Sequence, residues 1–160
     1  MKNSRYLAGI FVVAAVAAWQ WDAMLGPKSK LLADIENDDV AKVTDVFGTG
    51  WTKIYFLERF DLTQNRRLEI FGEVARDYAD DVPWEGDRNF WTIIVTYPNR
   101  KPKIIRMDKQ EHAQSRNSVS ETTSRDAVVV KVSTTETDYN KKCAVFVVPR
   151  TCLRLEAPEN

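Results

Sequence analysis

The sequence has few of the residues from which catalytic and metal sites are commonly built. Its 160 residues include one histidine, His112, and two cysteines, Cys143 and Cys152. One imidazole and two cysteines without CxxC or CxH spacing do not form a zinc-binding pattern. The phosphate-binding motifs GxGxxG and GxxxxGK[ST] and the nucleophile motif GxSxG are also missing from the sequence. The sequence therefore predicts no metal and no cofactor, and it favours a non-enzymatic role.

The only histidine lies in a long polar stretch, DKQEHAQSRNSVSETTSR, at residues 108–125. Ser115, Ser118 and Ser120 lie in the same stretch, but a preorganised triad needs rigid supports. We therefore interpret His112 as a solvated loop histidine. A polar segment of this length within a compact domain is predicted to be a mobile loop.

The chain also lacks an excess of positive charge. It contains 23 basic and 23 acidic residues, and 44% of its residues are hydrophobic. Nucleic-acid-binding proteins usually carry a basic excess on one face, so no nucleic-acid partner is expected. This composition is typical of a chain that folds, and the length predicts a single domain.

An apolar N-terminal segment is the clearest pattern in the sequence. Lys2 and Arg5 precede 13 residues, Tyr6–Ala18, without a charge or an amide. The alanines that end this run place small residues at −3 and −1 of two cleavage sites. A short basic region, an apolar run and such sites are typical of a signal peptide, whose removal would leave 21 basic and 23 acidic residues.

The alternative interpretation is a retained single-pass anchor that contacts the membrane through residues 6–21. Trp19 and Trp21 occupy the positions of an interfacial aromatic belt. A helix over residues 6–21 spans ~24 Å, which is slightly short of a ~30 Å hydrocarbon core. Extension to Leu25 reaches ~30 Å but adds Asp22, whose burial at mid-bilayer costs ~2.5–3.5 kcal/mol. Both interpretations remain open.

Either interpretation divides the chain into residues 1–25, a signal peptide or anchor, and residues 26–160, an exported domain. A retained anchor predicts an inner-membrane protein that faces the periplasm. A cleaved segment predicts a periplasmic or secreted protein.

Residues 26–160 are predicted to form an α+β domain in which helices pack on a mostly antiparallel sheet. One arrangement compatible with the element order is a strongly curved, cone-like sheet around a helical layer. The expected helices and strands follow hydrophobic periodicity and turn residues. The helices are expected at 28–47, interrupted at 37–39, and at 63–80; the strands are expected at 51–60, 90–97, 103–107, 126–138, 143–148 and 152–156.

Several side chains within these elements have predicted roles. Asp38 is expected to cap a second short helix that carries a stripe formed by Val40, Val43 and Phe47, and Asp61 or Thr63 is expected to cap the helix at 63–80. Two strands are expected to have apolar inner faces, formed by Trp91, Ile93, Val95 and Tyr97 in one and by Val128, Val130 and Val132 in the other. The stretch 143–148 is apolar on both faces, which predicts a central strand.

An acidic cluster around Trp84 is the most prominent charged feature. Its spacing does not match the EF-hand calcium loop, and nothing in the sequence sets the separation that paired glycosidase carboxylates require. It is either a solvated helix end and loop or an interaction surface. The acidic residues are Asp77, Asp80, Asp81, Glu85 and Asp87, and the surface in question comprises Asp80, Asp81, Trp84, Glu85 and Asp87.

The two cysteines leave their pairing open. Exported chains with two cysteines often form one disulfide. If Cys143–Val148 is extended and a turn follows, Cys143 lies ~15 Å from Cys152 at ~3.3 Å per residue. A disulfide needs a Cα separation of about 4.4–6.8 Å. A bridge between Cys143 and Cys152 therefore requires the chain between them to bend; otherwise both are buried thiols.

Three functions are compatible with these observations. The first is a non-enzymatic interaction domain that acts as a subunit or adaptor of a cell-envelope assembly, with a protein partner. The second is a soluble periplasmic inhibitor or immunity-type protein that binds through the acidic cluster. The third is a small-ligand binder or enzyme with a cone-shaped pocket.

Overall fold

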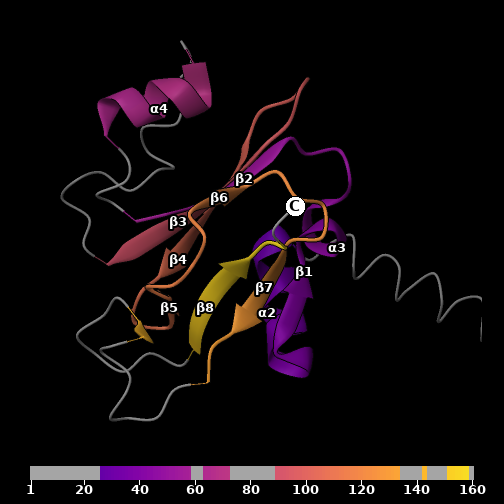
Figure 1. Cartoon of the computed structure of the whole chain (residues 1–160), viewed down its shortest axis with the longest axis vertical. Coiled ribbons are helices and arrows are strands. Elements are labelled where there is room, and N and C mark those ends of the chain that lie inside the picture. The colour runs from indigo at the N-terminus through magenta and orange to yellow at the C-terminus, as the bar shows by residue number, and fades with distance from the viewer. Residues whose placement is uncertain (1–25, 59–62, 73–88, 134–141, 144–150, 159–160) are drawn as a thin grey trace, which may run out of the picture.

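Two four-stranded sheets form the body of the domain (Figure 1). The computed structural model describes residues 26–58, 63–72, 89–133, 142–143 and 151–158. Sheet A has the strand order β1-β7-β8-β5, and its strands are β1 (Val40–Lys42), β7 (Val128–Lys131), β8 (Thr151–Glu156) and β5 (His112–Gln114). Sheet B has the order β4-β3-β2-β6, with strands β4 (Lys103–Asp108), β3 (Phe90–Thr96), β2 (Lys53–Leu57) and β6 (Glu121–Thr122).

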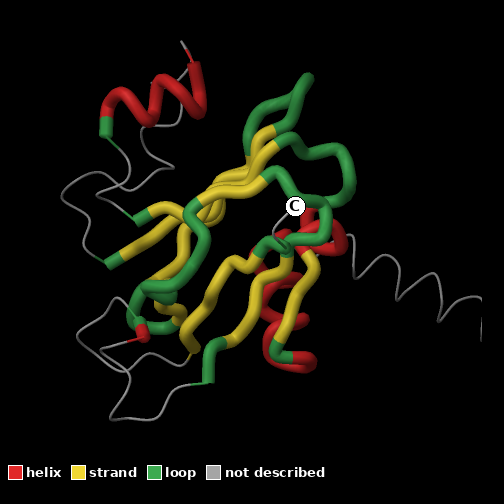
Figure 2. Tube along the Cα trace, viewed as in Figure 1, coloured by secondary structure: helices red, strands yellow, loops and turns green. Residues whose placement is uncertain are grey.

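Three helices accompany the two sheets, and Figure 2 distinguishes them from the strands. They are α2 (Pro27–Asp38), α3 (Val43–Phe47) and α4 (Gln64–Phe71). The predicted α+β class with mostly antiparallel pairing is confirmed; β5 and β8 are the one parallel pair among the described strands. None of the described helices is long and apolar enough to cross a membrane.

The cone-like arrangement is wrong, because neither sheet is strongly curled. The physical reason that the sheet does not form a cone lies in residues 108–125, the polar stretch predicted to be a loop. It contributes β5 to sheet A and β6 to sheet B, so the strands divide between two sheets that bury a shared core. Local hydrophobicity does not report such a division, since both short strands are polar in composition.

The main core is formed by the two sheets together with α2 and α3. Helix α2 contributes Leu31 and Ile35, and Trp51 from the loop before β2 is fully buried. The predicted inner face of β3 is confirmed, because all four of its residues belong to this core. They are Trp91, Ile93, Val95 and Tyr97.

A smaller apolar cluster lies on the opposite face of sheet B. It joins Ile70 and Phe71 of α4 to side chains of β2 and β3. The side chain of Thr63 accepts a hydrogen bond from the Arg66 backbone N–H, as the capping prediction required. Arg66 also forms an ion pair with Glu121 of β6, which ties α4 to the sheet. Helix α4 ends at Phe71 with Gly72 as its C-cap (φ 63°), earlier than the predicted end at residue 80, and residues 73–80 lie outside the described residues.

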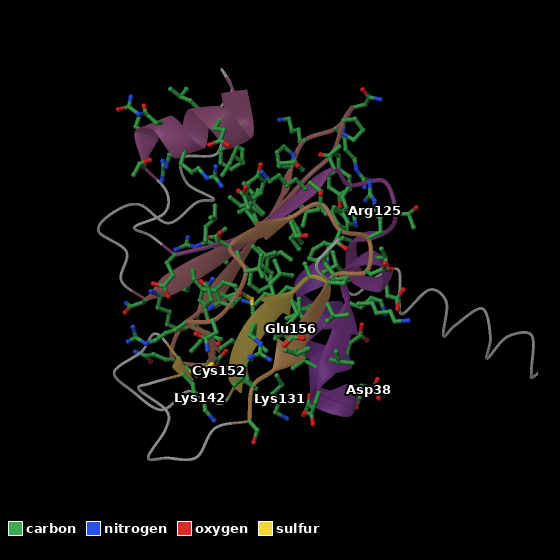
Figure 3. The ribbon with its side chains drawn as sticks, viewed as in Figure 1. Asp38, Arg125, Lys131, Lys142, Cys152 and Glu156 are labelled. Atoms are coloured by element: carbon green, nitrogen blue, oxygen red, sulfur yellow. A yellow bond between two sulfur atoms is a disulfide. The ribbon has the colours of Figure 1, made fainter. Side chains whose placement is uncertain are left out.

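The predicted second helix begins later than expected. Asp38 is the last residue of α2 rather than an N-cap (Figure 3). Asp39 adopts the left-handed conformation (φ 58°) that ends the helix, and its backbone N–H donates to the Ile35 carbonyl at 3.1 Å. The next three residues pair with β7 as strand β1, so Val40 is 39% exposed instead of lying on a helical stripe.

The valine run of β7 is buried on the face opposite to the predicted one. Val129 is completely buried, whereas Val128 and Val130 are only half-buried. A shift of the strand pairing by one residue moves every side chain of the strand to the other face of the sheet. Three successive valines give no local signal to fix it, and pairing with β1 and β8 determines the outcome.

Among the described strands, β7 and β8 are central in sheet A. The predicted central strand at 143–148 lies outside the described residues except for Cys143, which forms an isolated antiparallel bridge with Ser115. Strand β8 lies between β7 and β5, which explains its buried apolar side chains Cys152, Leu153 and Leu155.

Candidate interaction surface

The outer edge of β4 is the longest strand edge in the described part of the chain. The other three edge strands, β1, β5 and β6, contain three, three and two residues, whereas β4 contains six. Short edge strands limit unwanted pairing with other chains, because they present few free backbone groups. Strand β4 lacks this protection.

The register of β3 and β4 shows which backbone groups point away from the sheet. The Lys109 backbone N–H donates to the Asn89 carbonyl at 2.7 Å, which continues the register of the pair. The backbone N–H and C=O groups of successive residues point to opposite sides of a strand. Those of Ile105 and Met107 therefore point toward β3, and those of Ile104 and Arg106 point away from it. The Lys28 side chain confirms this orientation, because its Nζ donates to the Arg106 carbonyl at 2.9 Å.

Positive charge is concentrated on the hairpin that β3 and β4 form. Residues 89–110 contain five basic residues and one acidic residue, Asp108. Lys109 is paired with Glu58 at 2.8 Å. No carboxylate among the described residues forms an ion pair with Arg100, Lys101 or Lys103. The edge therefore combines the outward backbone groups of Ile104 with three cations that no carboxylate of the described residues neutralises.

Proline and cations at the start of β4 were the available sequence signals for this edge. Pro102 precedes Lys103, and both residue types are typical of exposed edge strands. These signals do not identify the surface by themselves, because an apolar pair such as Ile104 and Ile105 also fits a central strand.

We predict that amide hydrogen exchange will alternate along β4. The Ile105 and Met107 amides face β3 and should exchange about a hundredfold or more slowly than the outward Ile104 amide. Residue-resolved exchange measured by NMR tests this. Equal protection of these three amides would contradict the assigned edge.

Tyr97 supports the base of the basic hairpin. Its hydroxyl donates to the Phe47 carbonyl at 3.2 Å, and the Arg100 guanidinium lies 3.5 Å from the ring centroid. Burial raises the pKa of Tyr97 above its usual value of 10.0, while the positive charge and hydrogen bond of Arg100 oppose that rise. The ring thus holds a cation of the hairpin against the core.

The raised pKa of Tyr97 predicts a loss of stability in alkali. The folded state holds the phenol proton above pH 10.0, where the unfolded chain releases it, so unfolding becomes more favourable as the pH rises. Tyr97→Phe should show a shallower decline above about pH 10. Urea denaturation at a series of pH values measures this, with Tyr55→Phe as the matched control, and identical slopes in Tyr97→Phe and wild type would contradict it.

His112 is not a solvated loop residue, which corrects the prediction. It begins strand β5, and its Nδ1 lies 2.7 Å from the Thr151 hydroxyl oxygen of β8. The carboxylate of Glu111 lies 3.9 Å from its Nε2, and the His112 carbonyl accepts a hydrogen bond from Trp91 Nε1 at 2.6 Å. The polar stretch had obscured this strand. The Thr151 contact holds the imidazole where β5 meets β8 within sheet A, and the His112 carbonyl joins this sheet to Trp91 of sheet B.

The structure joins Cys143 and Cys152 in a disulfide with a Cα separation of 6.2 Å. Both residues are buried and pack with Ala113 and half-buried Val132. Figure 3 shows Lys142 and Cys152 close together at one end of β8. Residues 144–150, between the two cysteines, lie outside the described residues.

The remaining predicted sites also lie outside the described residues, so the structure does not place them. These are the proposed acidic surface, Asp80, Asp81, Trp84, Glu85 and Asp87, and the interfacial pair Trp19 and Trp21. Within the described ranges, no group of three or more histidine, cysteine or acidic side chains is arranged to hold a metal ion.

Comparisons of the chain with models of known protein families, with curated proteins and with solved structures find no match.

Proposed function

We propose that this chain is a non-enzymatic interaction domain that works outside the cytoplasm as a subunit or adaptor of a cell-envelope assembly. The observation that carries this proposal is the long basic edge of β4, whose outward backbone groups and cations suit a protein partner. Protein contact is the function to which such an edge is best adapted.

Two further observations support the proposed location outside the cytoplasm. The Cys143–Cys152 disulfide suits an oxidising compartment, since cytosolic thiols are kept reduced. The apolar run of residues 6–21 provides either an export signal or a tether. A tethered domain would present β4 to partners held in the same envelope.

The arrangement around His112 does not favour an enzyme. A hydroxyl and an imidazole are in contact there, but both belong to paired strands and serve to join β5 to β8. The cone-shaped pocket on which a ligand-binding role depended has no support, because the sheets are not strongly curled.

Cell fractionation combined with crosslinking in intact cells tests the proposal. We expect the chain in the membrane fraction or the periplasm, with its disulfide intact, and crosslinked to a protein partner. Sequencing of the mature N-terminus then separates an anchor, which retains Met1, from a cleaved signal, which leaves Ala18 or Trp19 first. A cytosolic chain with two free thiols, or one that yields no crosslinked partner, would overturn the proposal.

A further inference from the structure

We propose that the loop between α3 and β2, residues 48–51, binds a phosphate group together with Arg100 and Arg125. This binding site goes beyond the proposed interaction function and does not depend on it. Three observations carry the inference. They are N–H donors without acceptors in the loop, open space above its backbone, and a guanidinium stacked on an aromatic ring at each of its ends.

The 48–51 loop contains four N–H donors that have no acceptor among the described residues. They are the backbone N–H groups of Thr49, Gly50 and Trp51 and the indole N–H of Trp51. The N–H just before them, that of Gly48, donates to the Thr44 carbonyl at 2.8 Å. Trp51 is completely buried, and buried donors are almost always paired with protein, water or a ligand. The loop therefore offers donors to an acceptor from outside the chain.

Glycines leave the backbone of this loop open. Gly48 has a positive φ of 78°, which by itself favours glycine. Gly50 has no positive φ, and a Cβ added to it would meet no heavy atom within 4 Å beyond its chain neighbours. Both glycines are exposed. A ligand can thus approach the loop N–H groups directly, as anions do at other glycine-rich loops.

Arg125 supplies positive charge at the Trp51 end of the loop. Its Cζ lies 4.3 Å from the Trp51 ring centroid, and Figure 3 shows Arg125 at the same end of the domain as α3. The Ala127 carbonyl accepts from the Val43 N–H at 3.0 Å, which holds this segment against α3. Arg125 is exposed. In the described part of the chain no carboxylate pairs with it, including that of its neighbour Asp126.

Arg100 supplies the second cation, at the other end of the loop. Its Cζ lies 3.5 Å from the Tyr97 ring centroid, and the Tyr97 hydroxyl donates at 3.2 Å to the carbonyl of Phe47, the residue just before the loop. That hydrogen bond also occupies a carbonyl at the C-terminus of α3 that would otherwise repel an anion. Arg100 is exposed as well. The two guanidiniums thus border the donors of the loop.

This set of donors determines the chemistry of the ligand. A guanidinium binds an oxyanion through two parallel N–H···O bonds, and stacking on an aromatic ring leaves its edge available for them. A carboxylate presents two oxygens, whereas a phosphate group presents three or more and can accept from the loop and both arginines together. We therefore expect a phosphate group, carried either by a soluble molecule or by a phospholipid headgroup.

Titration of the purified full chain with sodium phosphate tests the inference. The chain is kept in non-ionic detergent micelles near neutral pH, and sodium chloride holds the ionic strength constant. We expect saturable NMR shifts of the Thr49, Gly50 and Trp51 backbone amides. Sodium acetate, a carboxylate of the same charge sign, should bind about tenfold or more weakly because it accepts fewer hydrogen bonds.

Three variants and one control assign the donors. Arg100→Gln and Arg125→Gln should each weaken phosphate binding about tenfold, because each removes a charge-assisted pair. Arg116→Gln changes another exposed arginine, which follows β5, and should leave binding unchanged. Gly50→Ala should also weaken binding, since its methyl group lies over the donors, without lowering stability. Thermal unfolding of each variant separates lost binding from lost fold.

Micelles that contain a small fraction of phosphatidylglycerol distinguish the two sources of phosphate. If the loop binds a headgroup, the lipid should shift the same three amides and weaken the apparent affinity for inorganic phosphate. If the ligand is soluble, only inorganic phosphate should shift them. The inference is overturned if neither shifts them, if acetate binds as tightly as phosphate, or if Arg100→Gln or Arg125→Gln binds like wild type. Loss of crosslinked partners in cells would remove the interaction function alone.

Discussion

Trp91→Ala is expected to lower the free energy of unfolding by about 3–5 kcal/mol, the largest effect of any single change considered. The Trp91 side chain is fully buried in the main core, with its ring centroid 5.1 Å from that of Phe56. It also joins the sheets, because its Nε1 in sheet B donates to the His112 carbonyl in sheet A at 2.6 Å. Denaturant unfolding followed by circular dichroism measures the loss.

A matched pair of tryptophans isolates the contribution of that hydrogen bond. Trp51 is equally buried, but its Nε1 has no hydrogen-bond partner among the described residues. Trp91→Phe removes the hydrogen bond to the part-buried His112 carbonyl and should cost about 1–3 kcal/mol more than Trp51→Phe. Equal losses in the two variants would show that Trp91 stabilises the fold by packing alone.

Removal of the disulfide is the second large effect. Cys143→Ala/Cys152→Ala is expected to lower the free energy of unfolding by about 2–4 kcal/mol, because the crosslink restricts the unfolded chain. The bridge joins residues nine positions apart and connects β8 to the segment that pairs with Ser115. Thermal and denaturant unfolding measure the change.

Reduction of the wild-type chain provides the control for this variant. A thiol reductant should lower wild-type stability toward that of the double variant and leave the double variant unchanged. If reductant destabilises neither, the bridge contributes nothing to the fold and its value as an indicator of compartment also falls. Loss of the bridge should leave the β4 edge intact, because β4 belongs to sheet B, whereas Cys152 lies in sheet A and Cys143 in an isolated bridge with Ser115.

Local sequence signals predicted the helices and strands of this fold better than they predicted which strands pair with one another. The alternating run from Trp91 to Tyr97 was placed correctly because successive side chains of a strand point to opposite faces of the sheet, so these four side chains share the face on the main core. The Thr63 cap was also identified locally, since a side-chain oxygen satisfies an otherwise free N–H at the start of a helix. Such features depend on neighbours a few residues away.

The predictions were wrong where pairing between strands far apart in the sequence determined a structure that the local hydrophobic pattern does not indicate. Val40 follows a helical spacing but pairs with β7, and the valines of β7 carry no alternation from which to choose a face. Strands β5 and β6 are too short and too polar to be detected, yet each completes a sheet. Their assignment depends on hydrogen bonds to strands far away in sequence.

The sequence by itself determined the α+β class, the antiparallel character of most strands and the inner face of β3, because these follow from periodicity and turn chemistry. Only the tertiary structure decided that the strands form two sheets, that Cys143 and Cys152 meet, and that β4 lies at an edge among the described strands. A strand becomes an edge through the absence of a neighbour. That property belongs to the arrangement of the whole sheet, and no residue within β4 encodes it alone.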